Sequence, residues 1–119
     1  MNPNSIDEMT ISVVIPAYNA ASTIERCLKA IAGQVRKPDQ VIVVDDGSTD
    51  GTAALASRFG VRVISQPNAG PAAARNRGAR AALGDLLLFT DADCAPAVDW
   101  VQQMTALLAD PATTAVRGA

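Results

Sequence analysis

Two aspartates, Asp91 and Asp93, follow a run of large apolar residues, Leu86–Phe89. An apolar run this short, preceded by Gly84, predicts a buried strand of a parallel sheet. Open α/β sheets bind ligands at their carboxyl edge, so both carboxylates are expected at such an edge. Two hard oxygen donors one residue apart suit Mg²⁺ or Mn²⁺, with a diphosphate completing the coordination. The alternative is a pair of solvated loop acids.

A second pair of acids, Asp45 and Asp46, follows another apolar run at residues 41–44 and precedes Gly47. One carboxylate of this pair would accept the ring N–H of a pyrimidine or the hydroxyl groups of a ribose. The residues that follow are dense in turn formers and helix caps. The alternative is therefore that the pair only shapes a turn.

Two further side chains are suited to binding a nucleotide. Tyr18 follows an apolar run at residues 11–15 that Pro16 closes, and its ring offers a flat face for a base. Arg75 lies in an alanine-rich helix predicted to begin near Pro71, from which it would reach phosphate oxygens. The alternatives are a plain core or rim position for Tyr18 and a solvated helix face for Arg75.

The elements that would position these residues follow from apolar runs, periodicity and the placement of Gly and Pro. Strands are expected at residues 11–15, 41–44, 61–65, 85–90 and 113–116. Helices are expected from residue 22 to about 33, through 55–59, from 71 to about 83, and from 96 to about 110. We therefore assign the fold class as α/β: a Rossmann-like doubly wound, mainly parallel sheet, truncated after about the fifth strand.

The first and last helices carry specific expectations. Ser22 and Glu25 have the spacing of a capping box. The apolar face of the first helix would consist of Ile24, Leu28, Ile31 and Val35. The apolar face of the last helix would consist of Val98, Val101, Met104 or Thr105, and Leu108.

The parallel topology would bring the loops after the first, second and fourth strands to one edge, because crossovers are right-handed. The side chains that would then gather around one crevice are Tyr18, Asp45, Asp46, Asp91 and Asp93. Acids this close repel one another unless a cation or hydrogen-bond donors balance their charge. A divalent metal would do so and would also screen an incoming nucleotide diphosphate.

Composition excludes several other classes of function. The chain has 119 residues and a net charge of −2, and it has no basic patch of the kind that binds nucleic acid. It contains no His, which excludes Ser/His and Cys/His catalysis and argues against zinc. No apolar run approaches the ~20 residues that span a bilayer. We expect one domain at residues 11–119 after a disordered lead-in at residues 1–10. The expected compartment is the cytoplasm, with peripheral contact to the inner membrane face left open.

With these motifs in view, the chain closely resembles the family 2 glycosyltransferases, which have the GT-A fold. The motifs occur in the family's order at residues 14–19, 43–52, 68–70, 74–78 and 90–93. The resemblance implies a nucleotide-sugar donor, commonly a UDP-sugar, and inverting transfer to a hydroxyl of a saccharide or lipid-linked acceptor. It also implies that Pro16, Ala17 and Tyr18 line the nucleoside pocket. Asp46 would hold the uracil with support from Asp45.

The resemblance assigns the remaining site residues to the diphosphate side of the donor. Arg75 lies where the family often approaches the donor. Asp91 would face the ribose and the metal, and Asp93 would coordinate Mn²⁺ or Mg²⁺ directly.

The family's catalytic base is a carboxylate from a later part of the domain, and no motif after Asp93 fits that role. We therefore expect the base beyond Ala119 and interpret the chain as the donor-binding half of a larger enzyme. An open edge strand at residues 113–118 would favour a homodimer. The alternative is a truncated nucleotide-binding or assembly module without turnover.

Overall fold

The protein structure is a computed structural model that describes residues 8–109. The elements in chain order are β1 (Ile11–Ala17), α1 (Ile24–Ala32), β2 (Gln40–Asp46), α2 (Thr52–Ser57), β3 (Arg62–Gln66), α3 (Pro71–Ala81), β4 (Leu86–Phe89) and α4 (Trp100–Ala109). The strands form a four-stranded parallel sheet in the order β3-β2-β1-β4. The predicted α/β fold class is therefore confirmed. The predicted fifth strand, at residues 113–116, lies outside the described residues.

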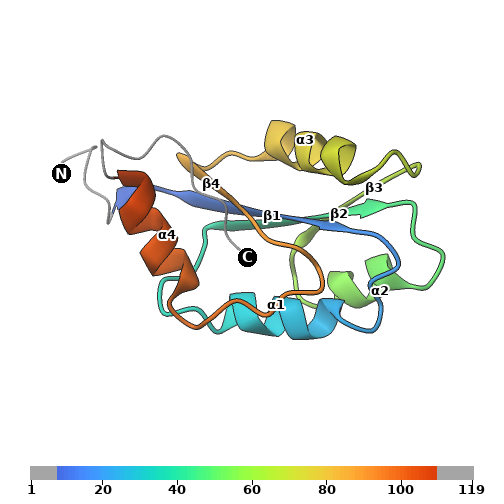
Figure 1. The fold of residues 1–119 in the computed structure, drawn as a ribbon, viewed down its shortest axis with the longest axis horizontal. Coiled ribbons are helices and arrows are strands. Elements are labelled where there is room, and N and C mark those ends of the chain that lie inside the picture. Colours follow the sequence, from blue (N-terminus) through green and yellow to red (C-terminus); the bar gives the residue numbers. More distant parts are fainter. Residues whose placement is uncertain (1–7, 110–119) are drawn as a thin grey trace.

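Helices cover both faces of the sheet, with α3 on one face and α1, α2 and α4 on the other (Figure 1). Successive residues of a strand point to opposite faces. Accordingly, Val13 and Ile15 of β1 pack in the core on the α1 side, whereas Val14 packs on the α3 side. Both faces of the interior strands β1 and β2 are buried, which explains their nearly continuous apolar sequences.

Helix α3 lies very close to the sheet because small residues face it. Gly78 is buried, and a Cβ atom at this position would overlap Val14 Cγ1 and lie 3.2 Å from Val44 Cγ2. Ala74, one turn earlier, is also buried in this layer. The small residues therefore set the height of α3 above β1 and β2.

Helix α1 differs from its prediction at both ends. Its N-cap is Thr23, which makes no side-chain capping bond, so the capping box expected at Ser22 and Glu25 is wrong. The helix ends at Ala32, and Val35 is 65% exposed instead of joining the apolar face. The chain turns away after Gly33, so the helical periodicity no longer decides which side chains are buried.

Helix α4 begins at Trp100 rather than near Pro96, and Val98 is exposed, contrary to prediction. Its start is fixed by the buried side chain of Gln34, whose Oε1 accepts from Val101 N at 2.9 Å. The Gln34 amide also donates to Ala97 O at 2.7 Å. A tertiary contact from the end of α1, not the local pattern, thus determines where α4 starts.

Strand β1 continues to Ala17 although Pro16 was predicted to end it. In a strand, residues i and i+2 direct their backbone N–H and C=O groups toward the same neighbouring strand. Val14 O accepts from Thr90 N on the β4 side, so Pro16 also faces that side, beyond the end of β4 at Phe89. The missing N–H of Pro16 therefore removes no ladder bond.

The predicted lead-in, residues 1–10, lies outside the described residues as far as residue 7. Thr10, its last residue, donates its backbone N–H to Asp85 Oδ2 at 3.0 Å. Within the described part of the chain, the helices are too short or too polar to cross a bilayer.

Candidate functional site

The carboxyl ends of β1 and β2, the loop after β4 and the start of α3 enclose a cavity of about 400 Å³, here called the α3-side cavity. Its lining residues are Pro16, Ala17, Tyr18, Asp46, Asn68, Gly70, Pro71, Ala74 and Asp91. This volume falls within the ~300–1,000 Å³ typical of small-molecule sites. Five of the residues expected from the sequence, drawn from three separate motifs, therefore meet here as lining residues.

A second cavity of about 420 Å³ adjoins the first on the α1 side of the sheet. The two cavities share Pro16, Tyr18 and Asp91, and Asp93 lines only the second. Tyr18 is 54% exposed, so its ring is available to a ligand and is not a core side chain. A larger cavity of about 500 Å³ opens at the opposite edge and contains none of the expected site residues.

Asp46 is buried, and its charge is balanced by N–H donors instead of a cation. Its Oδ1 accepts from Gln66 Nε2 at 2.9 Å and from Ala69 N at 2.8 Å. Its Oδ2 accepts from Gly70 N at 2.9 Å and from Asn68 Nδ2 at 3.3 Å. These bonds, the one from Gln66 foremost, hold the pKa of Asp46 below its ordinary value although burial opposes them. Asp46 is therefore a charged side chain in the cavity wall.

Asp45 occupies a different position, since it is buried but lines neither cavity at this edge. Its Oδ1 accepts from the N–H of Ser48, three residues further along, at 3.1 Å, and this bond closes the turn after β2. Gly47 in this turn has φ +78, and a Cβ there would lie 2.7 Å from Asn68 N. The turn after β2 thus packs directly on the loop that carries Asn68.

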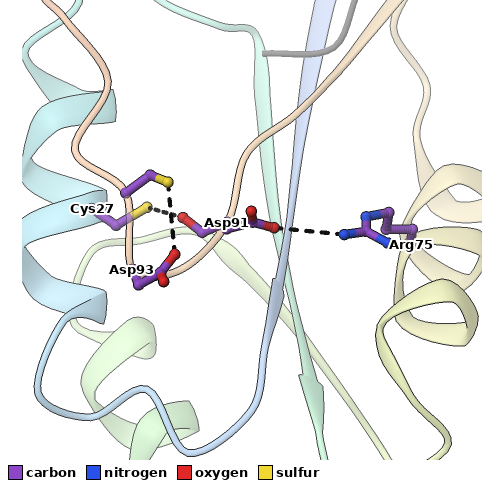
Figure 2. A network of polar contacts seen from close by, with 5 residues as sticks. Cys27, Arg75, Asp91 and Asp93 are labelled. Atoms are coloured by element: carbon purple, nitrogen blue, oxygen red, sulfur yellow. Dashed lines mark hydrogen bonds and ion pairs between the residues drawn. The ribbon is translucent and has the colours of Figure 1, made fainter. Parts of the chain in front are cut away.

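Asp91 lies between α1 and α3, with its main chain held and its carboxylate open (Figure 2). Its carbonyl oxygen accepts from Cys94 N at 3.1 Å and from Cys27 Sγ at 3.6 Å. Its Oδ1 lies 3.7 Å from Arg75 Nη2, and its side chain is 62% exposed. The carboxylate is therefore positioned but remains accessible to a ligand.

Asp93 is exposed, and its Oδ1 accepts from Cys94 Sγ at 3.6 Å. Ligand atoms of Asp91, Asp93 and Cys94 all lie within 4.8 Å of one another. The two carboxylates suit a hard divalent cation, whereas a thiol is a soft ligand. Burial, followed by the charge of Asp93, raises the pKa of Cys94, so this thiol stays protonated. The carboxylates are thus the part of the group that fits Mn²⁺ or Mg²⁺.

Most of the lining residues were expected from the sequence, but a few residues at the site had no role predicted for them. Asn68 and Ala74 were recognised only as motif positions, and the structure places both in the cavity wall. Gln66 was missed altogether as a partner of Asp46. A polar residue at a strand end carries no local signal for such a contact.

A model of the family described as Glycosyl transferase family 2 matches residues 12–119. The chain belongs to this family. Among its relatives, glycosyltransferase AglE of Haloferax volcanii is 38% identical over 101 residues, covering 78% of this chain and 33% of the relative. The uncharacterized glycosyltransferase YibD of Escherichia coli is 38% identical over 88 residues, covering 70% of this chain and 26% of the relative. The chain thus spans about a third or less of the length of these family members.

Two solved structures extend the comparison. Residues 1–349 of TarS of S. aureus, in complex with UDP-GlcNAc, have a TM-score of 0.77 at 30% sequence identity, and the match covers 84% of this chain and 31% of that fragment. Glucosyl-3-phosphoglycerate synthase from Mycobacterium tuberculosis, in complex with Mn²⁺, UDP and glucosyl-3-phosphoglycerate, has a TM-score of 0.76 at 34% identity. That match covers 89% of this chain and 44% of the synthase. The family and the GT-A type of fold expected from the motifs are therefore confirmed.

Proposed function

We propose that this chain binds a nucleotide-sugar donor, specifically a UDP-sugar, as part of a glycosyltransferase. The observation that carries the proposal is the meeting of Tyr18, Asp46 and Asp91 in one cavity, with Arg75 beside it. These side chains offer a stacking face, a buried acceptor, an accessible carboxylate and a cation. TarS has been solved with UDP-GlcNAc and the mycobacterial synthase with UDP, which supports the same donor class here.

The parts of the donor can be assigned to parts of the α3-side cavity. The base lies on the wall formed by Pro16, Ala17 and Tyr18, with Asp46 as the acceptor for its ring N–H. A buried carboxylate selects a base that donates at this position, because an acceptor there would be repelled. The ribose hydroxyls face the open carboxylate of Asp91.

The diphosphate lies between Arg75 and the acids after β4. Arg75 supplies a fixed positive charge, and its contact with Asp91 at 3.7 Å is loose enough to be rearranged by a phosphate. Asp91 and Asp93 would hold Mn²⁺ or Mg²⁺, which the hard oxygen donors fit. When bound, such an ion supplies Lewis-acid stabilisation of the charge that develops on the leaving diphosphate.

Glycosyl transfer to an acceptor hydroxyl is the activity that we propose for the whole protein, with inversion at the transferred carbon. Inverting transfer needs a carboxylate base on the face of the sugar opposite the leaving group. Asp99 accepts from Gln103 Nε2 at 2.6 Å and lines neither cavity at the carboxyl edge, so it is a poor candidate. We therefore assign no base within residues 8–109.

Titration calorimetry of the chain with UDP, in Mn²⁺ or in EDTA, tests the proposal. We expect binding in Mn²⁺ and a much weaker signal in EDTA, because Asp91 and Asp93 would then face the diphosphate without a counter-ion. Equal affinities in the two conditions would contradict the metal assignment. Absence of UDP binding in both would contradict the donor assignment. A parallel assay of UDP-sugar hydrolysis separates turnover from binding alone.

A further inference from the structure

Gln66, the last residue of β3, contacts the site only through another side chain. It lines neither cavity at the carboxyl edge, yet its Nε2 donates to Asp46 Oδ1 at 2.9 Å. The β2–β3 register places Asp46 directly beside Gln66. Directly paired residues on neighbouring strands have side chains within reach of each other. The contact is therefore built into the sheet and does not depend on a loop.

The other donors to Asp46 come from the loop that follows β3. Ala69 and Gly70 donate backbone N–H groups at 2.8 and 2.9 Å. Asn68 Nδ2 makes the longest bond, 3.3 Å to Oδ2, and it also donates to the carbonyl oxygen of Asp46 at 3.0 Å. A carboxylate offers about four acceptor positions, so all of them are in use.

A ligand N–H can reach Asp46 only by displacing one of these donors. The bond from Asn68 to Oδ2 is the one that can be given up, because the Asn68 amide keeps its second acceptor. On Oδ1, Gln66 and Ala69 both remain bound at short distances. Oδ2 is thus the oxygen available to a ligand, provided that Oδ1 stays where Gln66 holds it.

We propose that Gln66 is a positioning residue that fixes Oδ1 of Asp46 and thereby presents Oδ2 to the base of the nucleotide. The ligand in this statement rests on the proposed function. The fixing of Asp46 is a property of the chain without any ligand. Loss of the Gln66 donor leaves Oδ1 with Ala69 N as its remaining donor, so the carboxylate is held less firmly in the productive orientation. The looser hold lowers the affinity for the ligand even though Gln66 touches no part of it.

The charges around Asp46 indicate why this donor matters. Asp45 precedes it in β2, and Asp91 lines the same cavity from the loop after β4. Both are acids and offer Asp46 no counter-charge. Arg75 of α3 forms its ion pair with Asp91. Asp46 therefore depends on its N–H donors, and Gln66 is the largest cause that lowers its pKa.

The test compares Gln66→Met, which keeps the length of the side chain but removes the donor, with Gln66→Glu, which replaces the donor by a like charge. Ser65→Ala is the matched control, since Ser65 is an exposed neighbour on the same strand. The pKa of Asp46 is measured by carboxyl-carbon NMR on the unliganded chain, and UDP affinity is measured by calorimetry in Mn²⁺. Urea unfolding verifies that each variant is folded.

We expect Gln66→Met to raise the pKa of Asp46 and to weaken UDP binding by about tenfold. Gln66→Glu should do both more strongly, and Ser65→Ala should do neither. Unchanged UDP affinity in Gln66→Met, beside a wild-type chain that binds UDP, would overturn this inference alone. Weaker binding without a change in the pKa of Asp46 would also overturn it. A wild-type chain that does not bind UDP would instead overturn the proposed function, and the nucleotide part of this inference with it.

Discussion

The guanidinium of Arg75 lies 3.7 Å from the carboxylate of Asp91, which joins helix α3 to the loop after β4. The two side chains are 28% and 62% exposed. Ion pairs this open to solvent contribute little to folding stability, typically ~0–1 kcal/mol. The pair therefore serves to place opposite charges beside the cavity. A ligand can break the ion pair with little change in the free energy of unfolding.

Replacing Arg75 separates its contribution to folding stability from its contribution to ligand binding. We expect Arg75→Met to leave the free energy of unfolding within ~1 kcal/mol of wild type and to weaken UDP binding by about tenfold or more. Urea unfolding and calorimetry measure the two quantities. Arg77→Met is the matched control, because Arg77 is an exposed residue of the same helix. Equal losses of affinity in both variants would indicate a general charge effect and would contradict a specific role for Arg75.

The two groups of acids should respond differently to neutralisation. Asp93→Asn is expected to abolish the metal-dependent part of UDP binding and to keep the fold, because it relieves repulsion beside Asp91. Asp46→Asn is expected to weaken binding with or without metal, because it alters the wall that faces the base. Calorimetry in Mn²⁺ and in EDTA compares them. Identical behaviour of the two variants would show that this division of labour is wrong.

The cysteines beside the acids should be poorly reactive in the folded chain. Burial above all, and then the neighbouring Cys94 and the acids, raises the pKa of Cys27 to about 12. Only the thiolate reacts with alkylating agents. We expect slow alkylation of Cys27 and Cys94 at neutral pH and fast alkylation after unfolding in urea, as followed by mass spectrometry.

Asp93→Asn provides a control on the cause of this low reactivity. Removing the Asp93 charge should lower the pKa of Cys94 and speed its alkylation, while Cys27, governed mainly by burial, should change less. Equal acceleration at both cysteines would point to local unfolding and would contradict the electrostatic explanation.

Gly78 offers a test of how α3 is seated. Alanine in a helix interior is normally favoured over glycine by ~1 kcal/mol. Here an added Cβ would overlap Val14, and overpacking costs ~1–3 kcal/mol, so we expect Gly78→Ala to destabilise the chain. Urea unfolding measures the change, with Arg77→Ala as an exposed control in the same helix. A gain of stability in Gly78→Ala would contradict the close packing of α3.

The sequence predicted the edge at which the acids meet because two short apolar runs, at residues 41–44 and 86–89, are each followed by acids. In a parallel sheet these ends must share an edge, so Asp46 and Asp91 come to one cavity although they are far apart in the chain. This inference required only parallel strands joined by right-handed crossovers. It did not require any side-chain contact.

The predictions that were wrong or missing have one physical cause. Tertiary contacts, which the local sequence pattern does not contain, determine which side chains are buried and which groups bond to each other. Val35 and Val98 fit the helical period, yet Gln34 takes the buried position between α1 and α4. In the same way, the partners of Asp46 depend on the β2–β3 register and on the path of the next loop. Neither can be read from the residues around Asp46.

The contact between Gly47 and Asn68 has a consequence for protein engineering. The two motifs are separate in the chain, but the absent side chain of Gly47 leaves the space that the loop at Asn68 occupies. A larger residue at one position would force the other loop to be rebuilt. Chimaeras that exchange donor specificity between family members should therefore transplant the turn after β2 and the loop after β3 together. Either segment alone would lose the complementary surface on which it packs.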